Sequence, residues 1–310
     1  MKKYRLTFIL FVVIILSTLA ACGNEGVGDD RDDGRIVAYT SFYPMYDFTS
    51  KIGGDKIKVY NMVPAGIDPH DWEPKASDIV NLEKADIFIY NGAGMEHWVE
   101  DILASICNED LVVVEASKGI DLLDKKDHDH YDGHDHGQYD PHVWLNPQNA
   151  KLEMKNIMDA LVALDPANKE YYEENFNTYS QELDILHGEF LNTIEPLPNR
   201  DIVVSHMAFS YLCHAYGLNQ VAIEGLSSHS EPNPGRMAKI IDFIRENDIR
   251  VVFFEELSSP KIAETIAQAT GARVDVLHPL EGLRTEEIEK GEDYFSIMRK
   301  NLEALKRALE

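Results

Sequence analysis

Short apolar runs alternate with helical patterns along this chain, and they do so in two separate series. The first series predicts strands at 36–40, 56–63 and 86–90 and helices at 44–52, 76–84 and 96–106. The second predicts strands at 201–205, 221–224, 250–255 and 272–277. Strands separated by helices pair in parallel, with helices on both faces of the sheet. At roughly 150 residues per domain, a chain of 310 residues fits an α/β protein of two similar lobes with mainly parallel sheets.

The segment between the two series predicts one long helix. Asp165 suits an N-cap and Pro166 the first helical position. Apolar residues then recur every three or four positions, and a helix of about 28 residues would be ~42 Å long. The alternative is two shorter helices broken near Gly188. We therefore assign 36–164 to an N-terminal lobe, 165–195 to a rigid connecting helix and 196–310 to a C-terminal lobe.

The first 22 residues predict an export signal. Three basic residues precede an apolar run that is shorter than the ~20 residues a membrane-spanning helix needs. The run ends in Leu-Ala-Ala-Cys22, which resembles the lipobox of bacterial lipoproteins, in which the cysteine is lipidated. The alternative is a plain signal peptide with an incidental Cys22. Residues 23–35 are rich in Gly, Asp and Asn and predict a flexible tether.

The cysteine content and the net charge argue against a disulfide-stabilised fold and against anionic partners. Once Cys22 is assigned to lipid, two of the three cysteines remain, too few for a disulfide framework. The chain has 54 acidic and 29 basic residues, a net charge of −25. Such a charge argues against nucleic acid or an anionic lipid surface as a broad partner, because both would be repelled. It is compatible with a cationic ligand.

The tripeptide Asp-Pro-His occurs twice, ending at His70 and at His142, each time in a predicted loop with a tryptophan two residues after the histidine. Proline stiffens the approach to each imidazole, and the nearby carboxylate is placed to accept the second ring N–H, which orients histidines that bind metals. One such tripeptide would indicate only a solvated loop histidine. Two of them favour a metal site.

Two further candidates follow strands of the second series. His206 comes directly after the strand at 201–205, where ligands of open α/β sheets bind. The alternative for His206 is a buried, hydrogen-bonded histidine without a ligand. Glu281 follows the strand at 272–277 among Leu and Pro residues, where a half-buried carboxylate needs a cation. A helix-capping or surface role is the alternative for Glu281.

Four motifs together resemble one known family. They are Asp68-Pro-His-Asp-Trp-Glu-Pro-Lys-Ala-Ser-Asp78, Asp140-Pro-His-Val-Trp-Leu-Asn-Pro147, Ser205-His-Met-Ala-Phe-Ser-Tyr-Leu212 and Pro279-Leu-Glu-Gly-Leu283. From Cys22 onward the chain resembles the metal-binding lipoproteins of bacterial ABC importers (cluster A-I or cluster 9), specifically their zinc branch. The resemblance implies two β/α lobes joined by a single long helix, with the metal in the cleft between them. Its implied ligands are His70 and His142 from the first lobe and His206 and Glu281 from the second.

The implied ligand set favours zinc. Three imidazoles and one carboxylate fill a tetrahedral zinc shell. Manganese favours more oxygen ligands, and manganese relatives typically carry a carboxylate in place of the third histidine, so His206 indicates Zn²⁺. Cobalt, nickel and copper stay open. His278, three residues before Glu281, departs from the family pattern and is either a competing ligand or a polar residue at the rim of the cleft.

A second group of histidines lies in the segment 124–139, which combines histidine, aspartate and glycine and cannot form a core. Its histidines are His128, His130, His134 and His136. We expect this loop to capture zinc loosely or to sense its supply. The alternative is a solvated acidic loop with incidental affinity.

The prediction that follows is a binding protein and not an enzyme. A zinc hydrolase needs an open coordination position and a general base, and the chain has no His-Glu-x-x-His motif. The resemblance implies a monomer outside the cytoplasm, held at the outer leaflet of the cytoplasmic membrane by lipid on Cys22. It would capture Zn²⁺ and deliver it to an ABC permease and its ATPase subunit. The alternative within the family is a protein for manganese or another divalent metal, or an adhesin.

Overall fold

The computed structural model describes residues 34–124, 138–225 and 234–310. The predicted export signal with Cys22, nearly all of the predicted tether and the four histidines of the loop therefore lie outside the described residues. Within the described part, Ile36–Glu310 belongs to one compact unit. None of the helices in that part is long and apolar enough to cross a membrane.

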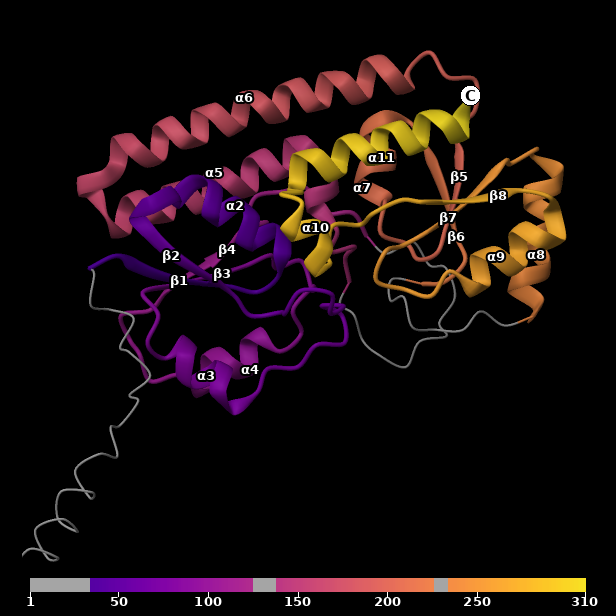
Figure 1. Ribbon diagram of the computed structural model, residues 1–310. Coiled ribbons are helices and arrows are strands. Elements are labelled where there is room, and N and C mark those ends of the chain that lie inside the picture. The colour runs from indigo at the N-terminus through magenta and orange to yellow at the C-terminus, as the bar shows by residue number, and fades with distance from the viewer. Residues whose placement is uncertain (1–33, 125–137, 226–233) are drawn as a thin grey trace, which may run out of the picture. The chain divides into compact units, whose positions relative to one another are not determined.

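The first lobe is built on a parallel four-stranded sheet in the order β2-β1-β3-β4. Its strands are β1 (Ile36–Thr40), β2 (Ile57–Asn61), β3 (Ile87–Tyr90) and β4 (Val112–Glu115). Helices α3 (Ala76–Leu82) and α4 (Val99–Ser105) cover one face, and α2 (Tyr43–Gly53) and α5 (Pro147–Leu164) cover the other (Figure 1). Strand β4 is an edge strand that the sequence analysis does not predict.

The second lobe repeats this order as β6-β5-β7-β8, again fully parallel. Its strands are β5 (Asp201–Val204), β6 (Asn219–Ala222), β7 (Val251–Phe254) and β8 (Arg273–Val276). Its helices are α7 (Ser210–Tyr216), α8 (Pro234–Glu246), α9 (Lys261–Thr270), α10 (Thr285–Glu289) and α11 (Tyr294–Leu309). The shared strand order confirms the prediction of two similar α/β lobes.

A single helix, α6 (Lys169–Ile194), connects the lobes and continues through Gly188 without a break. It is preceded by a short 3-10 turn at Pro166–Asn168, where the Asp165 carboxylate accepts hydrogen bonds from Asn168 and from the Tyr172 hydroxyl. The helix packs against α2 and α5 of the first lobe and against α7 and α11 of the second. In Figure 1 it runs past both sheets.

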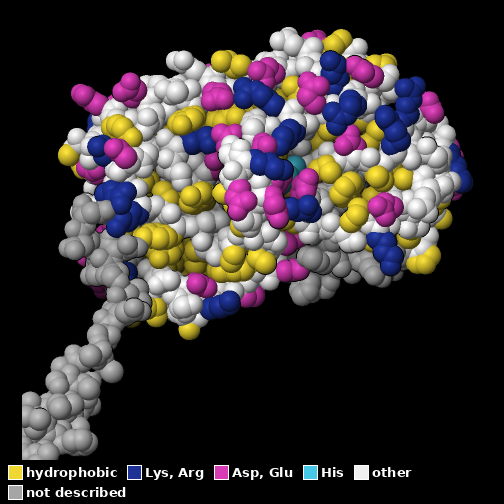
Figure 2. Space-filling view, in the orientation of Figure 1, with side chains coloured by type: hydrophobic (Ala, Val, Ile, Leu, Met, Phe, Trp, Pro, Cys, Tyr) yellow, Lys and Arg dark blue, Asp and Glu magenta, His cyan; other side chains and the backbone are white. Residues whose placement is uncertain are grey.

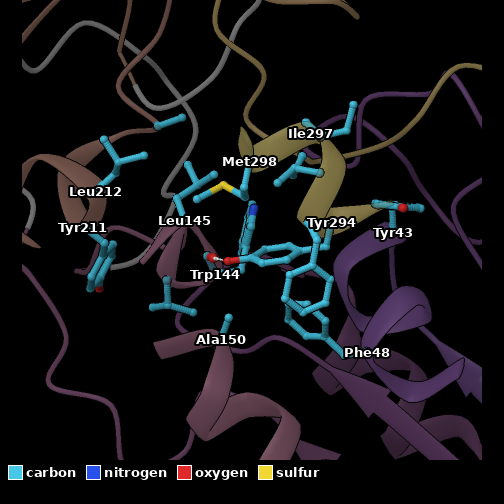
Figure 3. Close-up of a cluster of buried hydrophobic side chains, with 14 of the residues drawn as sticks. Tyr43, Phe48, Trp144, Leu145, Ala150, Tyr211, Leu212, Tyr294, Ile297 and Met298 are labelled. Atoms are coloured by element: carbon cyan, nitrogen blue, oxygen red, sulfur yellow. Dashed lines mark hydrogen bonds between the residues drawn. The ribbon is translucent and has the colours of Figure 1, made fainter. Parts of the chain in front are cut away.

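An aromatic cluster joins residues that are far apart in the sequence. Trp144, in the 3-10 turn Val143–Leu145, is fully buried and packs edge-on against Phe42. Tyr294, the first residue of α11, packs edge-on against Phe48 of α2. The Tyr294 hydroxyl donates to the Trp144 carbonyl oxygen at 2.7 Å (Figure 3). The last helix of the chain therefore helps to complete the core beside α2.

Candidate metal centre

The four residues predicted to bind a metal meet at one point. His70, His142, His206 and Glu281 each place one nitrogen or oxygen atom so that all four atoms lie within 4.8 Å of one another. All four side chains are buried, with His70 the most exposed at 8%. Figure 2 accordingly shows acidic and basic side chains over one face of the molecule but almost no histidine.

The geometry of the group is compact. Glu281 Oε1 lies 3.2 Å from His70 Nε2, 3.0 Å from His142 Nε2 and 3.2 Å from His206 Nε2. The three ring centroids are 5.4, 5.3 and 6.0 Å apart, so the imidazoles surround the carboxylate nearly evenly. Bonds of about 2.0–2.1 Å give a tetrahedral zinc shell ligand-to-ligand edges of about 3.3 Å. The three distances from Glu281 to the histidine nitrogens are close to that value.

The two Asp-Pro-His tripeptides hold their histidines through local hydrogen bonds. Asp68 Oδ1 accepts the backbone N–H of His70 at 2.8 Å. Asp140 Oδ1 accepts both the backbone N–H of His142, at 2.9 Å, and its Nδ1–H, at 2.7 Å. Because Nδ1 then carries the proton, the lone pair of His142 is on Nε2, the atom nearest Glu281. The prediction of a carboxylate that orients the ring is confirmed for His142.

His206 is oriented by a residue that the sequence analysis does not single out. It follows β5, and Glu255 follows the neighbouring strand β7. Glu255 Oε1 accepts the Nδ1–H of His206 at 2.5 Å and its backbone N–H at 3.2 Å. The available signal was an acidic residue ending an apolar strand, but the predicted strand at 250–255 included Glu255. In the structure β7 ends at Phe254, which leaves Glu255 at the edge of the sheet where the site lies.

Glu281 lies in a segment that is bonded to the first lobe on both of its sides. The Trp144 indole N–H donates to the Pro279 carbonyl oxygen at 2.8 Å. The Gly66 backbone N–H donates to the Leu283 carbonyl oxygen at 3.0 Å. In each bond, the residue of the first lobe is within four residues of a candidate histidine ligand, and the residue of the second lobe is two residues from Glu281. The segment that carries Glu281 is thus fixed relative to His70 and His142.

The structure contradicts the interpretation of His278 as a residue at the rim of the cleft and gives no support to a role as a competing ligand. The residue is 4% exposed, so it is not a polar residue at a rim. It is also not a member of the candidate metal-binding group found among the described residues. Its Nδ1 accepts the backbone N–H of Leu280 at 2.9 Å and is therefore occupied. The ring is part of the turn that precedes Glu281.

Burial and neighbouring charges shift the pKa values of His142, His206 and Glu281 in the metal-free protein. Burial lowers the pKa of His142, but Asp140 and Glu281 outweigh it and leave that pKa raised. Burial likewise opposes protonation of His206, whereas Glu255 and Glu281 bring its pKa well above the usual range. Burial raises the pKa of Glu281, but the three imidazoles hold it well below its ordinary value. The anionic carboxylate of Glu281 thus faces His142 and His206, whose raised pKa values favour protonation, and a cation has to displace those protons.

Comparison with known families gives this geometry a context. A family described as "Zinc-uptake complex component A periplasmic" (ZnuA) matches residues 38–308. The chain belongs to the ZnuA family. It is 42% identical over 316 residues to the high-affinity zinc uptake system protein ZnuA of Bacillus subtilis, covering 99% of this chain and 98% of that protein. It is 36% identical to the zinc-binding lipoprotein AdcA of Streptococcus pneumoniae, covering 100% of this chain but 62% of AdcA.

Solved structures of ZnuA relatives have the same fold. The Zn(II)-bound ZnuA-like domain of S. pneumoniae AdcA superposes with a TM-score of 0.78 at 36% identity, covering 89% of this chain and 99% of that domain. The metal-dependent lipoprotein YcdH of B. subtilis gives a TM-score of 0.79 at 42% identity, covering 89% and 100%. The laminin-binding protein Lmb of Streptococcus agalactiae, described as a bifunctional adhesin and metal transporter, gives 0.80 at 33% identity, covering 89% and 100%.

Proposed function

We propose that this ZnuA-family protein binds Zn²⁺ as cargo outside the cytoplasm and delivers it to the permease of an ABC importer. The observation that carries the proposal is the convergence of His70, His142, His206 and Glu281, whose ligand atoms lie within 4.8 Å of one another. Zinc uptake by the family and zinc binding by AdcA support the choice of ion.

The donor set suits capture better than catalysis. Three imidazole nitrogens and one carboxylate oxygen complete a four-coordinate zinc shell, whereas catalytic zinc keeps one position open for water. With few oxygen donors, the site is less suited to manganese. No thiolate takes part, which is consistent with an ion that has to be released again. The protein is therefore proposed to be a carrier and not a zinc enzyme.

Zinc titration of the purified, metal-free protein tests the assignment. Calorimetry with a competing chelator should show one tight zinc per chain. The variant carrying His70→Ala, His142→Ala and His206→Ala should lose that tight binding. His187→Ala is the matched control, because His187 lies on α6 and bonds to the Tyr216 hydroxyl at 3.1 Å. If the triple variant bound zinc as tightly as the parent, the ligand assignment would be wrong.

Membrane attachment through lipid on Cys22 is part of the proposal. The Leu-Ala-Ala-Cys22 motif and the lipoprotein name of AdcA support it. The mature protein isolated from its cells should have the mass of a chain that begins at a lipidated Cys22. Cys22→Ala should abolish both that mass and recovery with the membrane fraction. Recovery of the Cys22→Ala protein in the membrane fraction would contradict lipid anchoring.

The histidine-rich segment is proposed to hold zinc loosely before transfer to the buried group. Four histidines among aspartates and glycines support this role, because such tracts bind metals weakly. Deletion of residues 125–137 should remove weak zinc binding in titrations while the tight site keeps its affinity. An unchanged number of weakly bound zinc ions would argue against the role.

A further inference from the structure

The turn before Glu281 contains a strained residue. Leu280 has a φ of 62°, in the left-handed region that residues other than glycine seldom adopt. Its side chain is fully buried, so the conformation is fixed by its surroundings. Strained backbone of this kind persists only where neighbouring groups hold it, and it is concentrated at ligand sites. Here it lies one residue before the carboxylate that contacts all three imidazoles.

His278 holds the strained residue directly. Its Nδ1 accepts the Leu280 backbone N–H at 2.9 Å, a bond from a side chain to the backbone two residues on. Asn and Asp side chains make the same kind of bond in Asx turns. Because Nδ1 is the acceptor, the ring proton lies on Nε2. The imidazole of His278 therefore replaces the side-chain oxygen that such a turn usually contains.

Asn301 fixes His278 in turn from helix α11. The Asn301 Oδ1 accepts the His278 backbone N–H at 2.8 Å, and its Nδ2 donates to the His278 carbonyl oxygen at 2.7 Å. Both residues are nearly fully buried. A side-chain amide that pairs with both backbone groups of one residue leaves that residue little freedom to rotate. The turn is thus anchored to the rigid C-terminal helix at its first residue.

The surroundings of the other ring nitrogen, Nε2, indicate that packing alone does not explain a histidine at position 278. Its buried Nε2 makes no hydrogen bond among the described residues, and the carboxylate oxygen Glu287 Oε2 lies 3.8 Å away, beyond hydrogen-bond distance. Burial of an N–H without a partner is unfavourable, so an apolar ring would pack there more favourably. The feature that an apolar ring lacks is the acceptor Nδ1.

We propose that His278 and Asn301 are positioning residues for Glu281 and that they strengthen the preference for zinc over manganese that the donor set gives the site. The inference rests on the proposed zinc-binding function. A carboxylate held in one orientation offers a single oxygen to a tetrahedral ion. A carboxylate released from the turn can rotate and offer both oxygens. That arrangement suits manganese, which favours oxygen ligands and a larger number of ligands than zinc. Loss of the turn should therefore weaken zinc binding and relax selectivity together.

Substitution of His278 separates positioning from packing. His278→Phe keeps a buried ring but removes the acceptor, and His278→Asn keeps an acceptor for the Leu280 N–H. Zinc and manganese affinities of the metal-free proteins are to be measured by chelator competition. We expect His278→Phe to lose about 10- to 100-fold in zinc affinity and to have a lower zinc-to-manganese affinity ratio. His278→Asn should restore most of both. His187→Phe is the matched control and should match the parent.

Asn301→Asp supplies a second variant if His278→Phe does not fold, as judged by thermal melting without metal. It keeps the acceptor for the His278 N–H but loses the donor to the His278 carbonyl oxygen. Like His278→Phe, Asn301→Asp should lower both the zinc affinity and the zinc-to-manganese affinity ratio. The inference is overturned if the folded variants keep the parent's affinity ratio, or if His278→Asn is as impaired as His278→Phe. Failure of the parent protein itself to bind zinc would instead reject the proposed function.

Discussion

The indole N–H of Trp144 donates to the carbonyl oxygen of Pro279 at 2.8 Å, which bonds the segment that carries His142 to the segment that carries Glu281. Trp144→Phe keeps an aromatic ring but leaves this buried oxygen without its donor. We expect a loss of about 1–3 kcal/mol in the free energy of unfolding and faster zinc release, because the two segments are no longer bonded. Denaturant unfolding and stopped-flow transfer of zinc to a chelator measure the two effects.

Trp98→Phe is the control for Trp144→Phe. Trp98 is also buried, but it belongs to the separate cluster between β3, α3 and α4. It should cost stability without a change in the rate of zinc release. Equal release rates in the two variants would show that the Trp144 bond has no part in holding zinc.

Glu255→Gln tests how His206 is oriented. The carboxylate accepts two N–H groups of His206, and a glutamine amide can turn its NH₂ toward the same donors. We expect zinc affinity to fall about 10- to 100-fold, as is typical when a partner of a metal-binding histidine is lost. Glu256→Gln is the control, because Glu256 pairs with Arg284 at 2.9 Å and not with a candidate ligand. Chelator competition should separate the two variants clearly.

Zinc binding should weaken as the pH falls. In the metal-free protein the pKa of His142 and that of His206 are raised, so these rings hold protons above the ordinary histidine range. Zinc must displace these protons, and each one displaced costs about tenfold in affinity per pH unit below the folded pKa. The increase in melting temperature caused by zinc should therefore shrink from about pH 8 to about pH 6.

Without zinc, the histidines of the site should make the protein more stable as the pH falls, which is the opposite of the trend expected for zinc binding. The raised histidine pKa values contribute stability that is full below about pH 6.5 and is lost as the pH rises through the folded values. The lowered pKa of Glu281 contributes stability above about pH 4.3 and loses it only in stronger acid. Thermal melts with and without zinc across this range check both trends. A zinc-induced shift that is the same at about pH 6 and about pH 8 would count against histidine ligation.

Glu153→Gln should stabilise the protein at alkaline pH. Glu153 lies fully buried on α5, neither of its carboxylate oxygens has a hydrogen-bond partner among the described residues, and burial raises its pKa well above the ordinary value. The unfolded chain ionises Glu153 above about pH 4.3, whereas the folded chain ionises it only at a higher pH, so this residue lowers stability as the pH rises. The gain from Glu153→Gln in denaturant unfolding should be small near pH 5 and larger near pH 8.

Exposed Glu246 on α8 provides the matched control for Glu153. Glu246→Gln should change neither the stability nor its pH dependence. Zinc affinity should stay at the parent value in both variants. A Glu153→Gln protein with the same pH profile as the parent would contradict the burial argument.

Local sequence was sufficient to predict the parts of the site that are held by local contacts. Asp140 reaches the backbone and ring of His142 within a span of three residues, so the tripeptide itself encodes the orientation. The position of His206 at the end of an apolar strand was equally visible in the sequence. Its pairing with Glu255, 49 residues away, depends on β5 and β7 being neighbours in the sheet. The local sequence of neither strand predicts that order.

Other elements escaped prediction as well. Strand β4 is an edge strand with one buried side chain, Val114, but its run of three valines is as apolar as that of β5, so the sequence offered a signal that the prediction missed. The role of His278 depends on Asn301 of α11, 23 residues further on. Gly188 was a possible helix breaker, but α6 continues through it because the apolar stripe on either side is buried against both lobes.

The return of α11 to the first lobe has a consequence for the order of folding. The Tyr294 hydroxyl bonds to a carbonyl oxygen 150 residues earlier in the chain, and Asp293 pairs with Lys51 of α2 at 3.0 Å. Contacts across such sequence distances close large loops and form late. The core of the first lobe is therefore completed only after α11 has been synthesised. Tight zinc binding should appear only after α11 has docked on the first lobe, which makes the ion a reporter of a correctly folded α11.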